Sequence, residues 1–168
     1  MPALGFFTTM AGLALSLAGF ASLIAWLRDD QTRWDVINLW RVKTIVRQAL
    51  TILFIALLLH PVHALSGDDR TTVRVGAAVL ALFTLSEMAR NRRRDPAIWP
   101  VANFWRLSMA VSCAYVALHV AAFGLASTGL MQLGFLLVLM EPAGIFYNFV
   151  NELGAVPASA PAPGATDE

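Results

Sequence analysis

Polar and apolar positions alternate along this chain in long blocks rather than with the short period of a soluble helix or strand. Five blocks of about 17 to 24 mostly apolar residues are separated by shorter polar stretches. An α-helix rises about 1.5 Å per residue, so each block can cross the roughly 30 Å hydrocarbon core of a bilayer. The pattern predicts an all-α, polytopic membrane protein with a bundle of about five transmembrane helices. The expected spans are 4–27, 49–65, 73–89, 104–126 and 130–150.

Two stretches outside these spans have patterns of their own. Residues 34–48 mix tryptophan and isoleucine with charged side chains, which leaves two interpretations open. The stretch either lies along the membrane surface or lengthens the second helix beyond the bilayer. Residues 154–168 are rich in proline and alanine and have too few large apolar side chains to build a core. We therefore expect a transmembrane domain over 1–153 and a disordered cytoplasmic tail over 154–168.

The composition agrees with the membrane class. Hydrophobic residues make up 58% of the chain and charged residues only 14%, whereas a soluble domain carries about 25% charged residues. The single cysteine, Cys113, excludes an internal disulfide and lies inside an apolar block, where it is expected to act as a small packing residue.

The placement of the twelve basic residues predicts the topology. The first and third connections each carry five Lys or Arg residues, the second carries two, and the fourth carries none. Basic residues favour the cytoplasmic side, so the N-terminus is expected outside and the C-terminus inside. A compact, strongly positive-inside chain without eukaryotic sorting signals indicates the bacterial inner membrane. The third connection should also attract anionic lipid at roughly 1 kcal/mol per basic side chain, but it is too short to predict nucleic-acid binding. Its clustered residues are Arg90, Arg92, Arg93 and Arg94.

Glu141 is the candidate with the strongest functional signal. It stands at the twelfth position of the span 130–150, near the membrane midplane, where an ionised side chain is costly and usually functional. In the preceding span, Ser112, Tyr115 and His119 recur every three or four residues and so share one helical face. The turn between the two spans is short and predicts antiparallel neighbours. This register puts Tyr115 level with Glu141 and His119 about one turn further out.

Two interpretations of these polar residues remain open. They can line a proton or cation pathway, in which Asn148, on the Glu141 face, also takes part. Alternatively, Tyr115 and a protonated Glu141 only hydrogen-bond and lock the two helices together.

Small residues form a ridge on the first span. Gly5, Gly12, Ser16 and Gly19, together with Thr9, recur at spacings that put them on one helical face. Such ridges let helix backbones approach closely in lipid. The sequence leaves open whether the partner is another helix of this chain or a second copy.

His60 and His63 end the second span at a spacing that suits a shared metal ion on a helix. Two ligands fall short of the three or four that metal sites normally use, so they are weak candidates and no metal site is expected.

The function expected from these patterns is non-enzymatic. The chain contains no phosphate-binding glycine loop, HExxH or GxSxG motif, so neither an enzyme nor a cofactor is predicted. We expect a small, self-associating membrane protein that forms a pore or an ion- or proton-conducting pathway, of the holin-like or channel-like kind. The alternative is a non-catalytic membrane scaffold or an accessory subunit of a larger membrane complex.

Overall fold

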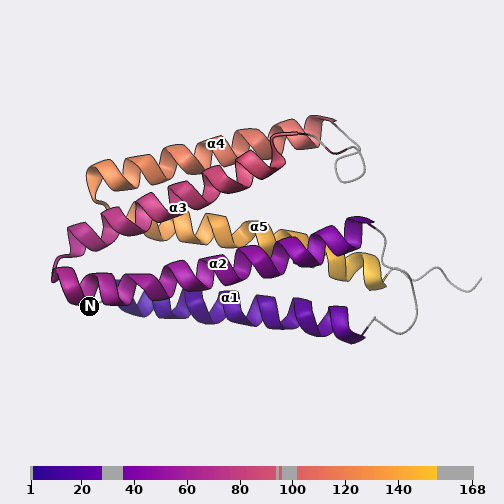
Figure 1. Cartoon of the computed structure of the whole chain (residues 1–168), viewed down its shortest axis with the longest axis horizontal. Helices are drawn as coiled ribbons and strands as arrows, with labels where there is room; N and C mark the ends of the chain where they lie inside the picture. The colour runs from indigo at the N-terminus through magenta and orange to yellow at the C-terminus, as the bar shows by residue number, and fades with distance from the viewer. Residues whose placement is uncertain (1, 28–35, 94, 96–101, 155–168) are drawn as a thin grey trace, which may run out of the picture.

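The computed structural model describes residues 2–27, 36–93, 95 and 102–154. This part of the chain forms five helices that run in alternating directions side by side (Figure 1). This confirms the predicted all-α class, and all five helices are long and apolar enough to cross a membrane, as a multi-pass protein requires. The helices are α1 (Pro2–Leu27), α2 (Val36–Ser66), α3 (Asp69–Asn91), α4 (Ala102–Leu125) and α5 (Thr128–Gly154).

Helix α2 differs most from its predicted span. It begins at Val36, thirteen residues before the expected start, and runs for 31 residues through Pro61. The described part of the stretch 34–48 therefore continues α2 as one helix, which is the second of the two interpretations. At the C-terminus, α5 includes Gly154, and the remainder of the predicted tail lies outside the described residues.

The bundle has two ends of different character. We call the end with Pro2 and the turns 66–69 and 125–128 the turn end, on the left in Figure 1. The opposite end, where α1, α3 and α5 finish and α2 and α4 begin, is the basic end. Most described basic residues lie in the half of the bundle towards the basic end, and only Arg70 and Arg74 lie near the turn end. Those towards the basic end are Arg41, Lys43, Arg47, Arg90, Arg92, Arg93 and Arg106.

The turn between α2 and α3 is fixed by its own residues. Gly67 adopts a φ of +63°, in the left-handed region that glycine enters without steric cost. Asp68 then caps α3, because its carboxylate accepts hydrogen bonds from the Thr71 hydroxyl and from the backbone N–H groups of Thr71 and Arg70. These bonds, the Thr71 hydroxyl first, lower the pKa of Asp68.

The hydrophobic core lies towards the turn end. Helix α1 contributes Phe7, Ala11 and Ala14, which recur at the spacing of a packing seam, and the small alanines let α2 approach closely. Phe135 of α5 packs against Phe7, with ring centroids 5.3 Å apart.

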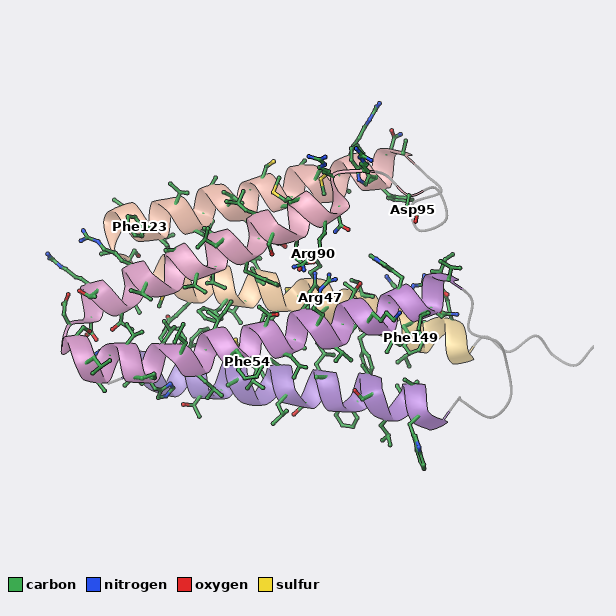
Figure 2. All side chains as sticks on the ribbon, viewed as in Figure 1. Arg47, Phe54, Arg90, Asp95, Phe123 and Phe149 are labelled. Atoms are coloured by element: carbon green, nitrogen blue, oxygen red, sulfur yellow. The ribbon has the colours of Figure 1, made fainter. Side chains whose placement is uncertain are left out.

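The outer surface is apolar on all five helices. The side chains of Trp26, Phe54, Leu82, Phe123 and Met140 are all exposed, and Figure 2 labels Phe54 on α2 and Phe123 near the turn end of α4. A soluble protein rarely exposes apolar side chains on every element, whereas lipid accepts them. The exposed surface therefore has the character expected of a protein surrounded by hydrocarbon.

Candidate functional site: a cavity at the basic end

A cavity of about 660 Å³ opens in the basic-end half of the bundle, lined mainly by α2, α4 and α5. Among the described helices, α2 and α4 do not contact each other; each packs instead against both α3 and α5. In Figure 1 the α3–α4 pair diverges from α2 towards the basic end, where the cavity lies. The indole of Trp105 donates a hydrogen bond of 2.9 Å to the Asn91 carbonyl and so ties the start of α4 to the end of α3.

The cavity brings together most of the polar residues selected from the sequence. Ser112 and Tyr115 of α4 and Glu141 and Asn148 of α5 all line it. Ser108, one turn before Ser112, lines it as well. The polar faces of α4 and α5 therefore meet around one space in the otherwise apolar bundle.

Glu141 is partly buried and has a neutral hydrogen-bond partner. The side-chain amide of Gln48, itself 2% exposed, hydrogen-bonds to the Glu141 carboxylate from α2. Tyr115 lies within electrostatic reach of Glu141, as do the charges of Arg47 and Glu87. No described Lys or Arg residue forms an ion pair with Glu141, so this carboxylate lines the cavity without a direct counter-ion.

A three-residue ion cluster lies beside this site and joins α2 to α3. The Glu87 carboxylate is nearly buried and receives Arg47 Nη2 of α2 and Arg90 Nη2 of its own helix, each at 2.5 Å. Figure 2 shows Arg47 and Arg90 reaching towards each other between the two helices. One buried acid thus faces two partly exposed bases, so the cluster carries a net charge of +1.

A second ion pair involves Arg41, which lines the cavity. Arg41 of α2 forms a bidentate pair with Glu152 of α5, in which Arg41 Nη2 lies 2.8 Å from Glu152 Oε1. Asn38 adds a longer contact to the same guanidinium. The charge of Arg41, which lines the cavity, is thus already neutralised.

His119 is not brought to Glu141. Its ring packs over Gly134, where a Cβ atom would lie 2.7 Å from both His119 Cε1 and Nδ1. Gly134 precedes Glu141 by seven residues, or about 10 Å along the helix, so His119 is roughly two turns from the carboxylate rather than one. The predicted depth of His119 relative to Glu141 was therefore wrong by about one turn. Its side chain is 1% exposed, and neither ring nitrogen has a hydrogen-bond partner among the described residues.

Replacing His119 with Leu is expected to stabilise the folded protein by about 1 kcal/mol, since a buried polar group without a partner costs roughly 1–3 kcal/mol. Thermal unfolding in detergent micelles, measured by circular dichroism, should show a higher melting temperature. His63→Leu is the control, because His63 Nδ1 lies 3.3 Å from the Thr72 hydroxyl and removal of a bonded ring should not stabilise the protein. A lower melting temperature for His119→Leu would mean that the ring is hydrogen-bonded in the folded protein.

The two histidines of α2 contact different neighbours. His60 reaches Thr8 of α1, whereas His63 Nδ1 lies 3.3 Å from the Thr72 hydroxyl and 3.5 Å from Asp69 Oδ1 on α3. Across the described ranges, no group of three or more His, Cys, Asp or Glu residues could hold a metal ion. The two histidines therefore link α2 to α1 and to α3.

The small-residue ridge of α1 faces away from the bundle. A Cβ atom added to Gly5, Gly12 or Gly19 would meet nothing within 4 Å. The hydroxyls of Thr9 and Ser16 donate to carbonyls of their own helix, at 3.0 and 2.9 Å. Within the described chain, α1 packs instead through its opposite face, so the ridge is open to lipid or to another molecule.

Three residues of the site were not selected from the sequence. Gln48 and Arg47 lie in the stretch 34–48, outside the predicted second span, and Glu87 lies near the end of the predicted span 73–89. The signal that could have found Gln48 is the spacing of Arg41, Thr44 and Gln48, which fall on one face of a helix that continues through 49. Arg94 of the predicted lipid-binding cluster lies outside the described residues, while Arg92 and Arg93 are exposed.

Comparisons of the chain with family models, with curated proteins and with solved structures find no match in any of the three.

Proposed function

We propose that this protein is a small membrane transport protein in which Glu141 accepts a proton or a cation from the cavity at the basic end. One observation carries the proposal. Glu141 belongs to a membrane-length helix, its carboxylate lines the cavity, and it has no direct counter-ion among the described residues. A carboxylate in this position is costly to retain unless it exchanges charge with a mobile ion.

The route beyond Glu141 runs towards the turn end. Tyr115 and His119 follow on α4 as the next titratable side chains, and the unpartnered ring nitrogens of His119 suit a transient proton carrier. Phe135 and Val138 of α5 are buried in the core along this part of the bundle. Net passage therefore requires these apolar side chains to move apart, or a second copy to supply part of the wall.

The orientation belongs to the same proposal. The concentration of basic residues supports a cytoplasmic basic end, with the N-terminus outside, the C-terminus inside and the tail in the cytoplasm. We propose the bacterial inner membrane as the location. Exposed Arg92 and Arg93 would then face anionic headgroups of the cytoplasmic leaflet, together with Arg90 and Arg94.

Glu141→Gln should abolish proton or monovalent-cation flux in liposomes that contain the purified protein, because the neutral amide keeps the shape but cannot exchange charge. Flux is measured with an internal pH dye and with an ion-selective dye, under an imposed gradient. Asp68→Asn is the matched control: it also removes one carboxylate, but asparagine retains the helix cap. Undiminished flux through a well-folded Glu141→Gln protein, or no flux through wild type, would contradict the proposal.

The ridge on α1 supports self-association through a second copy. Identical ridges of small residues can pack closely against each other around a two-fold axis. Gly12→Leu is expected to convert the oligomer to monomer, because the new side chain projects from the middle of the ridge. Light scattering in detergent measures the mass, with Gly124→Leu on exposed α4 as the control. A mass that is the same for wild type and Gly12→Leu would contradict this proposal.

A structural subunit is the second candidate, and the bond between Gln48 and Glu141 favours it. That bond joins α2 to α5 and would satisfy a protonated or ionised Glu141 without any transport. In this case neither wild type nor the Glu141→Gln variant should show flux, and the variant should have a lower melting temperature. Purification should also recover a membrane partner at fixed stoichiometry.

A further inference from the structure

The cavity at the basic end has the size and lining of a small-molecule site. Its volume of about 660 Å³ falls within the range of roughly 300–1,000 Å³ that is typical of ligand pockets. Three helices supply the apolar walls, through Ile37 of α2, Leu107 and Val111 of α4, and Met140 and Ile145 of α5. A ligand that fills this space must itself be largely apolar.

The charges around the cavity select the sign of the ligand. Arg41 is held in a bidentate pair by Glu152, so its positive charge is already compensated. Glu141 lines the same space with only a neutral amide bonded to it, and the Arg47–Glu87–Arg90 cluster beside it does not line the cavity. A carboxylate in low-dielectric surroundings attracts a monovalent cation and repels an anion far more strongly than it would in water.

Aromatic side chains favour an organic cation over a hydrated metal ion. Trp40, Phe104 and Tyr115 all line the cavity, and aromatic faces attract cations whose charge is spread over an apolar body. A small inorganic ion would lose its hydration shell against walls that are mostly apolar. A large organic cation loses little hydration and gains the contact area.

The cavity is also open to the surface of the bundle. Phe104, Leu107 and Met140 each line it and are each at least 60% exposed. Because these side chains lie on the lipid-facing surface of membrane-length helices, a ligand dissolved in the bilayer can enter without crossing water.

We propose that the cavity binds a monovalent hydrophobic organic cation, with Glu141 as its counter-ion and the aromatic side chains around it. This inference rests on the proposed function, since it names the class of charge that the same carboxylate exchanges. The binding step itself does not require conduction, so the two can be tested separately.

Equilibrium dialysis of the full chain in detergent micelles, with tetraphenylphosphonium as the probe, tests the inference. Tetraphenylborate serves as the matched anion, because it has the same shape and the opposite charge. We expect wild type to bind the cation at least tenfold more tightly than the anion, after subtraction of binding to empty micelles. Glu141→Gln should weaken cation binding at least tenfold, and Asp68→Asn should leave it unchanged.

A second variant covers the case in which Glu141→Gln fails to fold. Val111→Trp fills the cavity from a partly exposed position on α4 and should remove cation binding while Glu141 stays in place. Equal binding of the two ions by wild type, or full binding by a folded Glu141→Gln or Val111→Trp protein, would overturn the inference. Proton flux that depends on Glu141, without binding of the organic cation, would overturn the binding site but not the transport function. Binding of the organic cation without any flux would support the binding site and contradict the transport function.

Discussion

Glu87→Gln should lower the free energy of unfolding by about 2–3 kcal/mol. Its carboxylate is 6% exposed and lies between two guanidinium groups that come from α2 and α3. Removing one partner of a fully buried ion pair costs about 3–5 kcal/mol, since the other charge stays buried without compensation. Here the side chains of Arg47 and Arg90 are 41% and 50% exposed, so water compensates them in part and the expected cost is smaller. Unfolding by SDS in mixed micelles, followed by circular dichroism, measures the change.

Glu152→Gln provides the comparison for Glu87. It removes a carboxylate from an ion pair that also joins two helices, but the Glu152 side chain is 58% exposed. Exposed pairs contribute at most about 1 kcal/mol, so the loss should be clearly smaller than for Glu87→Gln. The prediction would be contradicted if the two variants lost the same free energy of unfolding, or if Glu87→Gln lost none. Burial of the Glu87 cluster would then not govern how much it stabilises the protein.

Gly134→Ala should destabilise the α4–α5 pair by roughly 1–3 kcal/mol, the usual cost of overpacking a tight interface. The added Cβ atom would lie 2.7 Å from two atoms of the His119 ring, and that ring is itself buried and has no open space to enter. Either the ring must leave its position or α5 must move away from α4. The melting temperature in detergent should fall, whereas Gly124→Ala, at an open site on α4, should leave it unchanged or raise it.

A double variant separates crowding from other effects of Gly134→Ala. His119→Ala removes the ring that the new methyl group meets, so Gly134→Ala should cost much less in that background than in wild type. An identical cost in both backgrounds would show that the destabilisation arises elsewhere, for example from a change in the backbone of α5.

Much of the fold could be predicted from the sequence because hydrophobic length is a local property. Each of the five apolar blocks is long enough to span lipid, and backbone hydrogen bonds within a single segment make a helix the natural form there. The spans 4–27 and 104–126 match α1 and α4 to within two residues at each end. The polar faces of α4 and α5 could also be paired, since a short turn determines which helices are neighbours. Orientation, conduction and self-association depend on surroundings that the chain does not contain, so they stay predictions.

The all-α class, the five membrane-length helices and the polar face that carries Glu141 could all be predicted from the chain alone. The side chains that surround Glu141 became evident only from the packing of the helices. Gln48 reaches Glu141 because α2 continues beyond the apolar block 49–65 towards the basic end, and Arg47 meets Glu87 from the same extension. The tertiary structure also placed His119 over Gly134 and turned the small-residue ridge of α1 outward. These outcomes depend on helix rotation and interhelical register, which arise from the packing of all five helices and leave no signal in the hydrophobic length of any one segment.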